Sequence, residues 1–202
     1  MVPPHPEFDW LAGHGPLGEI FCVSFVKDLS PREVLDRLGV DESTIRETGF
    51  GELDELAMEG AEETGGQDAG WVGAVRLGDW TALVEPWGWR VPVRRGVLGR
   101  LSEGTEVVSV SRHDHAFDTF VYGVDRDVML RFEPVAPQYA EGVDAGRWET
   151  AMAEVGLRRE DDGSRSESPI TSAFALARWI TGVAFTSDVL ERSFLVAVAD
   201  QE

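Results

Sequence analysis

One short segment, residues 85–90, concentrates the side chains best suited to bind another molecule. The rings of Trp87 and Trp89 flank a glycine, the carboxylate of Glu85 precedes them, and a guanidinium follows. Tryptophan and arginine dominate hot spots of protein interfaces, and the same groups can clamp a small ligand. The alternative is that both rings cap the core over the end of a hairpin. With arginines near two later strands added, the candidate binding residues are Glu85, Trp87, Trp89, Arg90, Arg112 and Arg131.

Two histidines, His113 and His115, are the candidates for a metal site. On an extended chain their imidazoles point the same way, and Asp114 or Asp118 would add a carboxylate. However, the pair lies at the tip of a predicted hairpin, and no third histidine is nearby. A solvated turn is therefore the favoured interpretation, and we predict no metal site.

Catalytic motifs are missing from the sequence. The single cysteine, Cys22, lies in an apolar run, where a thiol behaves as a small hydrophobic side chain. One cysteine also excludes an internal disulfide and a cysteine-rich zinc site. The chain has no Gly-x-Ser-x-Gly motif, and residues 96–100 lack the ending of a phosphate-binding loop. We therefore predict neither a catalytic residue nor a cofactor.

The net charge restricts the classes of partner. Lys and Arg number 18 and Asp and Glu number 37, which gives a formal charge of −19. Such a field repels nucleic acid and anionic membrane surfaces and attracts a basic protein. The alternative is that the acidic surface serves solubility alone. We therefore expect a basic protein as the partner, with no nucleic acid and no membrane, while the oligomeric state stays open.

The charges are unevenly distributed along the chain. Residues 41–68 contain ten acidic residues and one arginine, whereas residues 86–100 contain four arginines and no acid. The two segments either pair with each other or lie on solvated faces, or else the arginines form a local site for an acidic group. The four arginines are Arg90, Arg94, Arg95 and Arg100.

The first half of the chain carries clear signals for strands and helices. Residues 20–26 are rich in β-forming residues, and Ser30 with Glu33 forms a capping box for the helix that follows. A two-residue turn at 78–79 predicts a hairpin of residues 71–77 and 80–86 in which Leu77 pairs with Trp80. Residues 51–63 are either an acidic helix or a mobile loop, and residues 97–101 form a short helix.

Three further strands are expected at residues 105–111, 117–124 and 127–132, with the four residues 113–116 turning the first into the second and the two residues 125–126 turning the second into the third. In that register the opposite face, with Phe120 and Tyr122, is neither clean surface nor clean core. It would be covered by a helix or would bind a partner. The expected core face consists of Val108, Val110, Val121, Val128, Leu130 and Phe132.

The chain becomes helical after residue 134, with helices expected up to Gly156, from Ser168 to Gly182, and from Ser187 onward. The predicted fold is α+β, with a twisted, mainly antiparallel sheet of about five to six strands flanked by helices and a helical C-terminus. Residues 1–17 are expected to form a flexible arm and residues 18–202 a single domain, with its core at 18–156 and C-terminal helices at 168–198. Since no secretory signal or membrane-spanning run is visible, we expect a cytoplasmic protein.

Residues 78–89 read Gly-Asp-Trp-Thr-Ala-Leu-Val-Glu-Pro-Trp-Gly-Trp, with a second similarity at residues 101–109. This pattern resembles the Gly-x-Trp-Thr-x-x-x-Glu-Pro-x-Gly-Trp signature of an uncharacterised domain family of high-GC Gram-positive bacteria. The resemblance covers about residues 18–156. It implies no activity and no catalytic residue, because the family is one of unknown function.

Two functions from different classes follow from these observations. The first is a non-enzymatic, acidic interaction protein that binds a protein partner, in an immunity-like or regulatory role, through its acidic surface and Trp89. The second is a small-molecule sensor or enzyme whose pocket lies at Glu85, Trp87 and Trp89. Saturable binding of an anionic metabolite, lost on mutation of Arg90, would favour the second.

Overall fold

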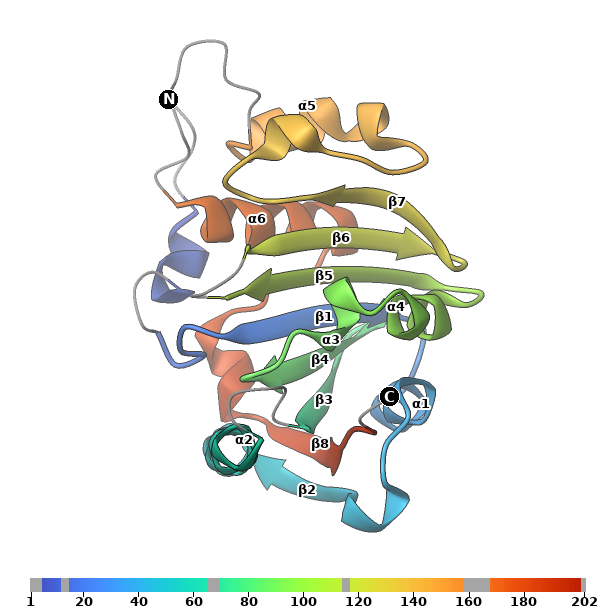
Figure 1. The fold of residues 1–202 in the computed structure, drawn as a ribbon. Coiled ribbons are helices and arrows are strands. Elements are labelled where there is room, and N and C mark those ends of the chain that lie inside the picture. The colour runs from blue at the N-terminus through green and yellow to red at the C-terminus, as the bar shows by residue number, and fades with distance from the viewer. Residues whose placement is uncertain (1–4, 12–14, 65–69, 114–116, 158–167, 201–202) are drawn as a thin grey trace.

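The computed structural model describes residues 5–11, 15–64, 70–113, 117–157 and 168–200. Within these ranges eight strands form one open sheet in the order β2-β8-β3-β4-β1-β5-β6-β7, and each neighbouring pair is antiparallel (Figure 1). The α+β class is confirmed, and the sheet is larger than the expected five to six strands. The strands are β1 (Phe21–Lys27), β2 (Arg46–Gly49), β3 (Trp71–Leu77), β4 (Trp80–Pro86), β5 (Glu106–Arg112), β6 (Thr119–Val124), β7 (Asp127–Phe132) and β8 (Ser193–Val198).

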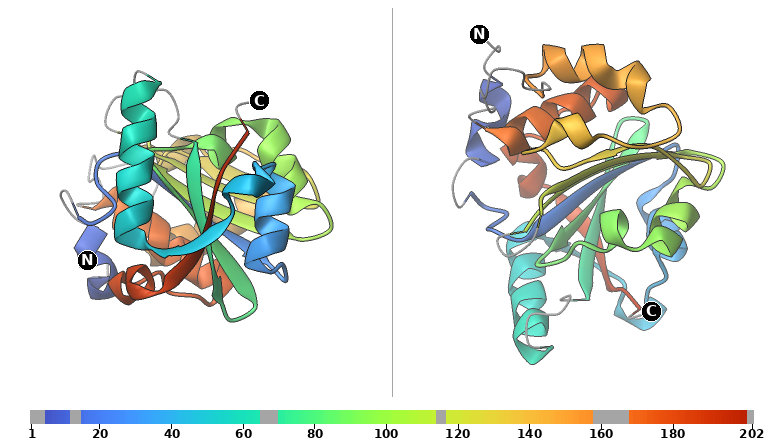
Figure 2. Two further views of the ribbon diagram at one scale, coloured as in Figure 1. Left: turned by 90° about the horizontal axis from the view of Figure 1, so that it is seen from below. Right: turned by 45° about the horizontal axis from the view of Figure 1, so that its top comes forward.

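Helices cover both faces of this twisted sheet (Figures 1 and 2). One core contains side chains of α2, α5, α6 and η1, and the other contains side chains of α1, α3 and α4. No helix in the described part of the chain is long and apolar enough to cross a membrane. The helices are α1 (Pro31–Leu38), α2 (Phe50–Glu63), α3 (Arg90–Val93), α4 (Arg95–Ser102), α5 (Glu149–Glu154) and α6 (Pro169–Thr181), with 3-10 helices η1 (Pro6–Leu11), η2 (Glu42–Thr44), η3 (Pro137–Tyr139), η4 (Ala145–Trp148) and η5 (Ser187–Glu191).

The locally encoded elements of the first half agree with the sequence prediction. Ser30 and Glu33 form both hydrogen bonds of a capping box at the start of α1. Leu77 pairs with Trp80 across the β3–β4 turn, as expected. The acidic segment forms the helix α2, whose apolar side, including Leu53, is buried against the sheet.

The register of β6 differs from the expected one. Ser111 pairs with Thr119, one residue beyond the partner that a four-residue connection gives, and a β-bulge follows Tyr122 on the other side of β6. Because side chains alternate between faces, a one-residue slip moves them all to the opposite face. The expected core face is therefore wrong in four positions: Phe120 and Tyr122 join Val108, Val110, Leu130 and Phe132, whereas Val121 and Val128 lie in the second core.

The C-terminus ends in a strand and not in the expected helix. After the short η5, β8 inserts between β2 and β3, with Trp71 paired to Val198 and Arg46 paired to Val196. Phe194 packs into one core and Leu195 against the other. Because both faces of β8 are covered, its sequence lacks the polar alternation that marks a half-exposed strand.

The N-terminal residues pack against the domain over part of the expected arm. Within η1, Phe8 and Leu11 are buried, and the ring of Phe8 lies 5.9 Å from that of Phe174 in α6. The side chain of Glu7 also forms an ion pair with Arg178 at 2.5 Å. These contacts attach residues 6–11 to the same core as α6.

Candidate functional site

Glu85 and Arg90 form a buried ion pair at the end of β4. Glu85 is 0% exposed and Arg90 is 2% exposed, and the Arg90 Nη1 atom lies 3.7 Å from Glu85 Oε2. The same carboxylate accepts a hydrogen bond from the backbone N–H of Arg90 at 3.0 Å. Buried charges are tolerated where they are paired and hydrogen-bonded in this way. The pair therefore holds α3 against the sheet.

The thiol of Cys22 lies next to this pair, since Cys22 is opposite Glu85 in the strand register. Its Sγ atom is 3.1 Å from Oγ of Ser109, which accepts a hydrogen bond from the Ser24 hydroxyl at 2.8 Å. Burial raises the pKa of Cys22 well above its ordinary value, and the negative charge of Glu85 raises it further. Because the thiolate is the reactive form, Cys22 is a poor nucleophile.

Trp87 turns away from the ion pair and packs on α2. Its φ of +57° lies in the left-handed region, and its backbone N–H donates to the carbonyl of Ile20 at 3.0 Å. The ring packs against Ala57 and Ala61, and its indole N–H donates to the carboxylate of Asp54. Burial raises the pKa of Asp54, and this hydrogen bond opposes the rise.

Trp89 lies near the end of β5, where its ring makes an edge contact with His113 at a centroid distance of 4.3 Å. The backbone N–H of His113 donates to the carboxylate of Asp118 at 3.1 Å. Burial raises the pKa of Asp118, although this hydrogen bond and the charge of Arg112 oppose the rise. Arg112 itself stacks over the ring of Phe21 at 5.6 Å, and burial lowers its pKa. The six predicted binding residues are therefore distributed over different surroundings.

The structure describes only one of the two metal candidates. His113 contacts Trp89, and His115 lies outside the described residues. Across the parts of the chain that the structure describes, no group of three or more His, Cys, Asp or Glu residues could hold a metal ion.

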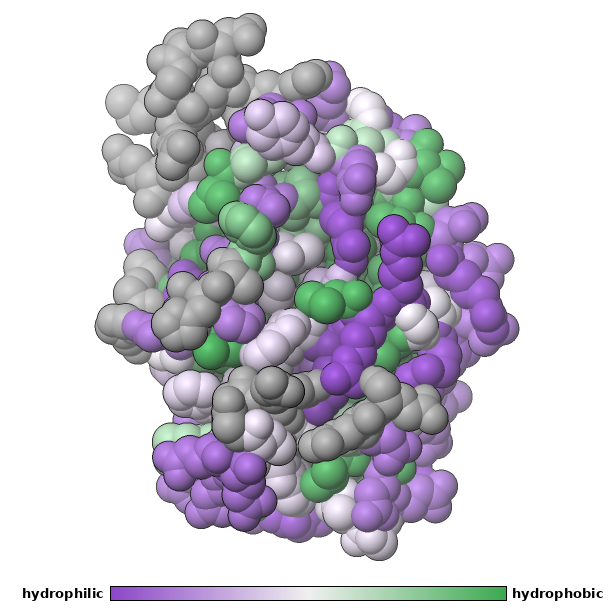
Figure 3. Space-filling model, viewed as in Figure 1, coloured by the Kyte–Doolittle hydropathy of each residue, from purple (hydrophilic) through white to green (hydrophobic). Residues whose placement is uncertain are grey.

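An apolar groove of about 600 Å³ lies between α3, the start of β6, the end of β7 and the segment around η3. Val93 is 59% exposed, Phe117 69% and Tyr139 78%, and all three line the groove. Figure 3 views this face and shows hydrophobic side chains next to strongly hydrophilic ones over α3 and the strands behind it. Large apolar side chains that gather at one exposed hollow are typical of an interaction site.

Arg131 places a positive charge within this groove. Its Nη2 donates to the carbonyl of Pro92, which ties β7 to α3. Burial lowers the pKa of Arg131 and the charge of Glu141 opposes the change, so the guanidinium stays charged at neutral pH. Glu133 and Glu141 complete an acidic rim around the apolar side chains.

A smaller cleft of about 210 Å³ lies on the other side of α3. It is lined by arginines from three helical segments, together with Asp36 and Asp200. Three of these arginines belong to the acid-free segment 86–100 that the sequence analysis singled out. The arginines are Arg37, Arg90, Arg94 and Arg100.

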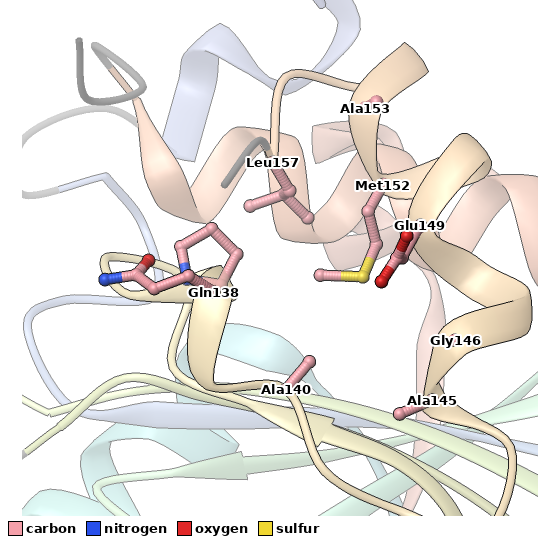
Figure 4. A pocket seen from close by; sticks show the side chains of 9 residues that line it. Gln138, Ala140, Ala145, Gly146, Glu149, Met152, Ala153 and Leu157 are labelled. Carbon is pink, nitrogen blue, oxygen red and sulfur yellow. The ribbon is translucent and has the colours of Figure 1, made fainter. Parts of the chain in front are cut away.

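A third cavity, of about 440 Å³, lies between η3, η4 and α5. Figure 4 shows the side chains of Met152 and Leu157 pointing into it, opposite Ala140. The residues that line it are apolar or glycine, apart from Gln138 and Glu149. It therefore offers fewer groups for specific recognition than the groove or the cleft.

Arg131 is among the binding residues predicted from the sequence, whereas Val93, Phe117 and Tyr139, the exposed apolar residues of the groove, are not. Their spacing along the chain carries no signal, because they come from three separate elements. A weak signal was available in the apolar residues next to Pro92 and Pro137, where the chain is outside the regular strands. The burial of Arg90 carried no signal in the sequence either, because it depends on tertiary packing.

Comparisons with known proteins give one match. A model described as "Family of unknown function (DUF6461)" matches residues 4–202, which extends well beyond the 18–156 covered by the sequence resemblance. No curated protein and no solved structure matches the chain.

Proposed function

The chain belongs to this family of unknown function, and because membership brings no activity with it, we propose from the geometry that the protein is a non-enzymatic module that binds a basic protein partner. We further propose that it acts in the cytoplasm, in an immunity-like or regulatory role. The observation that carries the proposal is the apolar groove at Val93, Phe117 and Tyr139.

The groove supports a protein partner because its apolar side chains are large and exposed. A buried ligand site normally encloses such side chains, whereas an interface leaves them exposed until the partner binds. Phe117 and Tyr139 are aromatic, and aromatic residues contribute strongly to protein interfaces. Their exposed fractions of 69% and 78% leave much apolar surface to bury.

The charge of the chain supports a basic partner. Glu133 and Glu141 line the groove, and the whole protein has a formal charge of −19. A partner that inserts an apolar side chain next to lysine or arginine would match both features. Long-range attraction would also raise its association rate at low salt.

The test compares three baits in a lysate of the source cells. The wild type, Phe117→Ser and the control Val143→Ser are immobilised, and the retained proteins are identified by mass spectrometry at low and high salt. Val143 is 73% exposed but does not line the groove. We expect one basic protein on the wild type and on the control, absent with Phe117→Ser and weakened by salt. Identical retention on all three baits would contradict the proposal.

A second function, small-molecule sensing, has one observation in its favour. Arg90, from the segment that the sequence analysis proposed as a pocket, lines the arginine cleft. The ligand would then lie on α3 and not between the two tryptophans, because Trp87 and Trp89 pack on different elements.

A further inference from the structure

Arg131 is the only cation among the described residues that line the apolar groove, and most of its hydrogen-bonding capacity is unused. Its Nη2 donates to the carbonyl of Pro92. Within the part of the chain that the structure describes, Nε is buried without an acceptor, and Nη1 is not buried and forms no hydrogen bond or ion pair. Since a guanidinium carries five N–H donors in a fixed fork, Arg131 keeps donors for a bound partner.

The guanidinium of Arg131 is held in position before anything binds. The backbone of Arg131 exchanges two hydrogen bonds with Glu141, at 2.7 Å and 2.8 Å, and its side chain is tied to α3 through Pro92. The exposed Val93 follows Pro92 directly and lines the same groove. A donor that is already in place loses little conformational entropy on binding. The groove thus combines exposed apolar side chains with a fixed polar donor.

The two glutamates of the groove restrict the acceptor that can approach Arg131. Neither Glu133 nor Glu141 forms an ion pair with a cation of the described residues, and together with Arg131 they give the lining a formal charge of −1. A carboxylate of the partner would be repelled by them, whereas lysine or arginine would be attracted. The acceptor for Arg131 is therefore an uncharged oxygen. Main-chain carbonyls within a helix are used by the helix itself, but those of an extended segment are free to accept.

We propose that the groove binds an extended segment of the partner, in which a main-chain carbonyl accepts a hydrogen bond from Arg131 and basic side chains face Glu133 and Glu141. An apolar side chain of the same segment packs among the exposed apolar residues of the groove. This inference rests on the proposed function and adds to it the form of the bound segment and the acceptor for Arg131. Extended peptides commonly gain affinity from main-chain hydrogen bonds and specificity from their side chains.

The positive charge of Arg131 makes the direction of a mutational effect informative. If Arg131 acted through its charge alone, its removal would strengthen the binding of a basic segment. If it donates to a carbonyl, its removal weakens binding. Arg95 is the matched control for charge, because it is exposed and does not line the groove, while its charge acts on Arg131.

The test selects random linear peptides on the immobilised full chain. The tightest binder is synthesised with acetylated and amidated ends, and its affinity is measured by calorimetry. We expect a sequence with a large apolar residue next to lysine or arginine. Arg131→Met should weaken its binding about tenfold, as expected for a hydrogen bond to a charged group, whereas Arg95→Gln should leave it equal or tighter. Unchanged or tighter binding to Arg131→Met would overturn the proposal.

A second measurement separates the donor from the structural tether, because Arg131 also ties β7 to α3. Each amide of the peptide is replaced in turn by an ester, whose carbonyl is a weaker acceptor. One replacement should weaken binding to the wild type but not to Arg131→Met, because the acceptor and the donor belong to the same hydrogen bond. Arg131→Lys takes the place of Arg131→Met if the unfolding midpoint shows that Arg131→Met is not folded. Equal losses in the wild type and the variant at every position would contradict the hydrogen bond.

Phe117→Ser distinguishes a failure of this inference from a failure of the proposed function. If no peptide is enriched, or if the peptide binds Phe117→Ser as tightly as the wild type, the groove is not the interface and both proposals fail. If Phe117→Ser abolishes binding but Arg131→Met does not weaken it, the groove remains the interface and the hydrogen bond from Arg131 is refuted.

Discussion

The arginine cleft and the apolar groove lie on two sides of the four-residue helix α3, and they reverse the usual distribution of side chains. On the cleft side, the charged Arg90 is 2% exposed. On the groove side, the apolar Val93 is 59% exposed. Folded proteins normally bury valine and expose arginine, so both positions depart from the pattern in one short segment.

The different burial of Arg90 and Val93 has a physical reason on each side of α3. Arg90 remains buried because Glu85 neutralises it and also binds the first N–H of α3. The apolar side chain of Val93 is left exposed, and its burial by a bound partner would be favourable. Stability is therefore expected to depend on the cleft side of α3, and recognition of the protein partner on the groove side.

The largest effect is expected from Glu85→Gln, which keeps the shape of the side chain but removes its charge. We expect the free energy of unfolding in urea to fall by about 3–5 kcal/mol, because the buried Arg90 loses the negative charge of Glu85. Glu103→Gln is the control, since Glu103 pairs with Arg126 on the surface at 2.5 Å. There the loss should be under about 1 kcal/mol. Similar losses in both variants would refute the special role of the buried pair.

On the groove side, Val93→Ser should leave the unfolding free energy within about 0.5 kcal/mol of the wild type, because the side chain is exposed. The affinity for the captured partner should fall about tenfold, which corresponds to about 1.4 kcal/mol. Titration calorimetry with the purified partner measures this change. Val143→Ser should bind like the wild type, and an equal loss there would show that the groove is not the contact.

The pH dependence of stability tests the buried thiol of Cys22, which lies next to the Glu85–Arg90 pair. Because the pKa of Cys22 is raised in the folded state, the folded protein keeps the thiol proton above about pH 8.5, where the unfolded chain releases it. The free energy of unfolding therefore falls as the pH rises through this range, by up to about 1.4 kcal/mol per unit from this group. Unfolding curves of the wild type and Cys22→Ala at pH 8, 9 and 10 should converge as the pH rises. Parallel pH dependences would show that the thiol is not protected.

The smallest effect is expected from Arg100→Gln, which removes hydrogen bonds to the carbonyls at the end of α1. A cation at a helix C-terminus contributes about 0.3–1 kcal/mol, so thermal unfolding should show a loss of that size. Arg95→Gln, at an exposed position, should change less. A loss of several kcal/mol would mean that Arg100 contributes as much to stability as the buried Arg90, and the contrast between the cleft arginines would disappear.

Much of the framework could be predicted where the signals are local. The capping box of Ser30, the turn at residues 78–79 and the left-handed Gly182 that ends α6 each depend on a few neighbouring residues. The β8 strand could not be predicted in this way, because its pairing with Trp71 joins residues more than a hundred positions apart. Its apolar run fits a buried helix as well as a strand covered on both faces.

For the candidate site, the sequence by itself determined which chemistry is present: an acidic chain, one segment rich in arginine and tryptophan, and a family of unknown function. Only the tertiary structure decided where each group lies, with Glu85 and Arg90 inside and Val93 outside. The physical reason is that the burial of a side chain depends on what packs over it. In this protein the residues that line the cleft beside α3 come from α1, near the start of the chain, and from Asp200, after β8, so the sequence around α3 does not specify its surroundings.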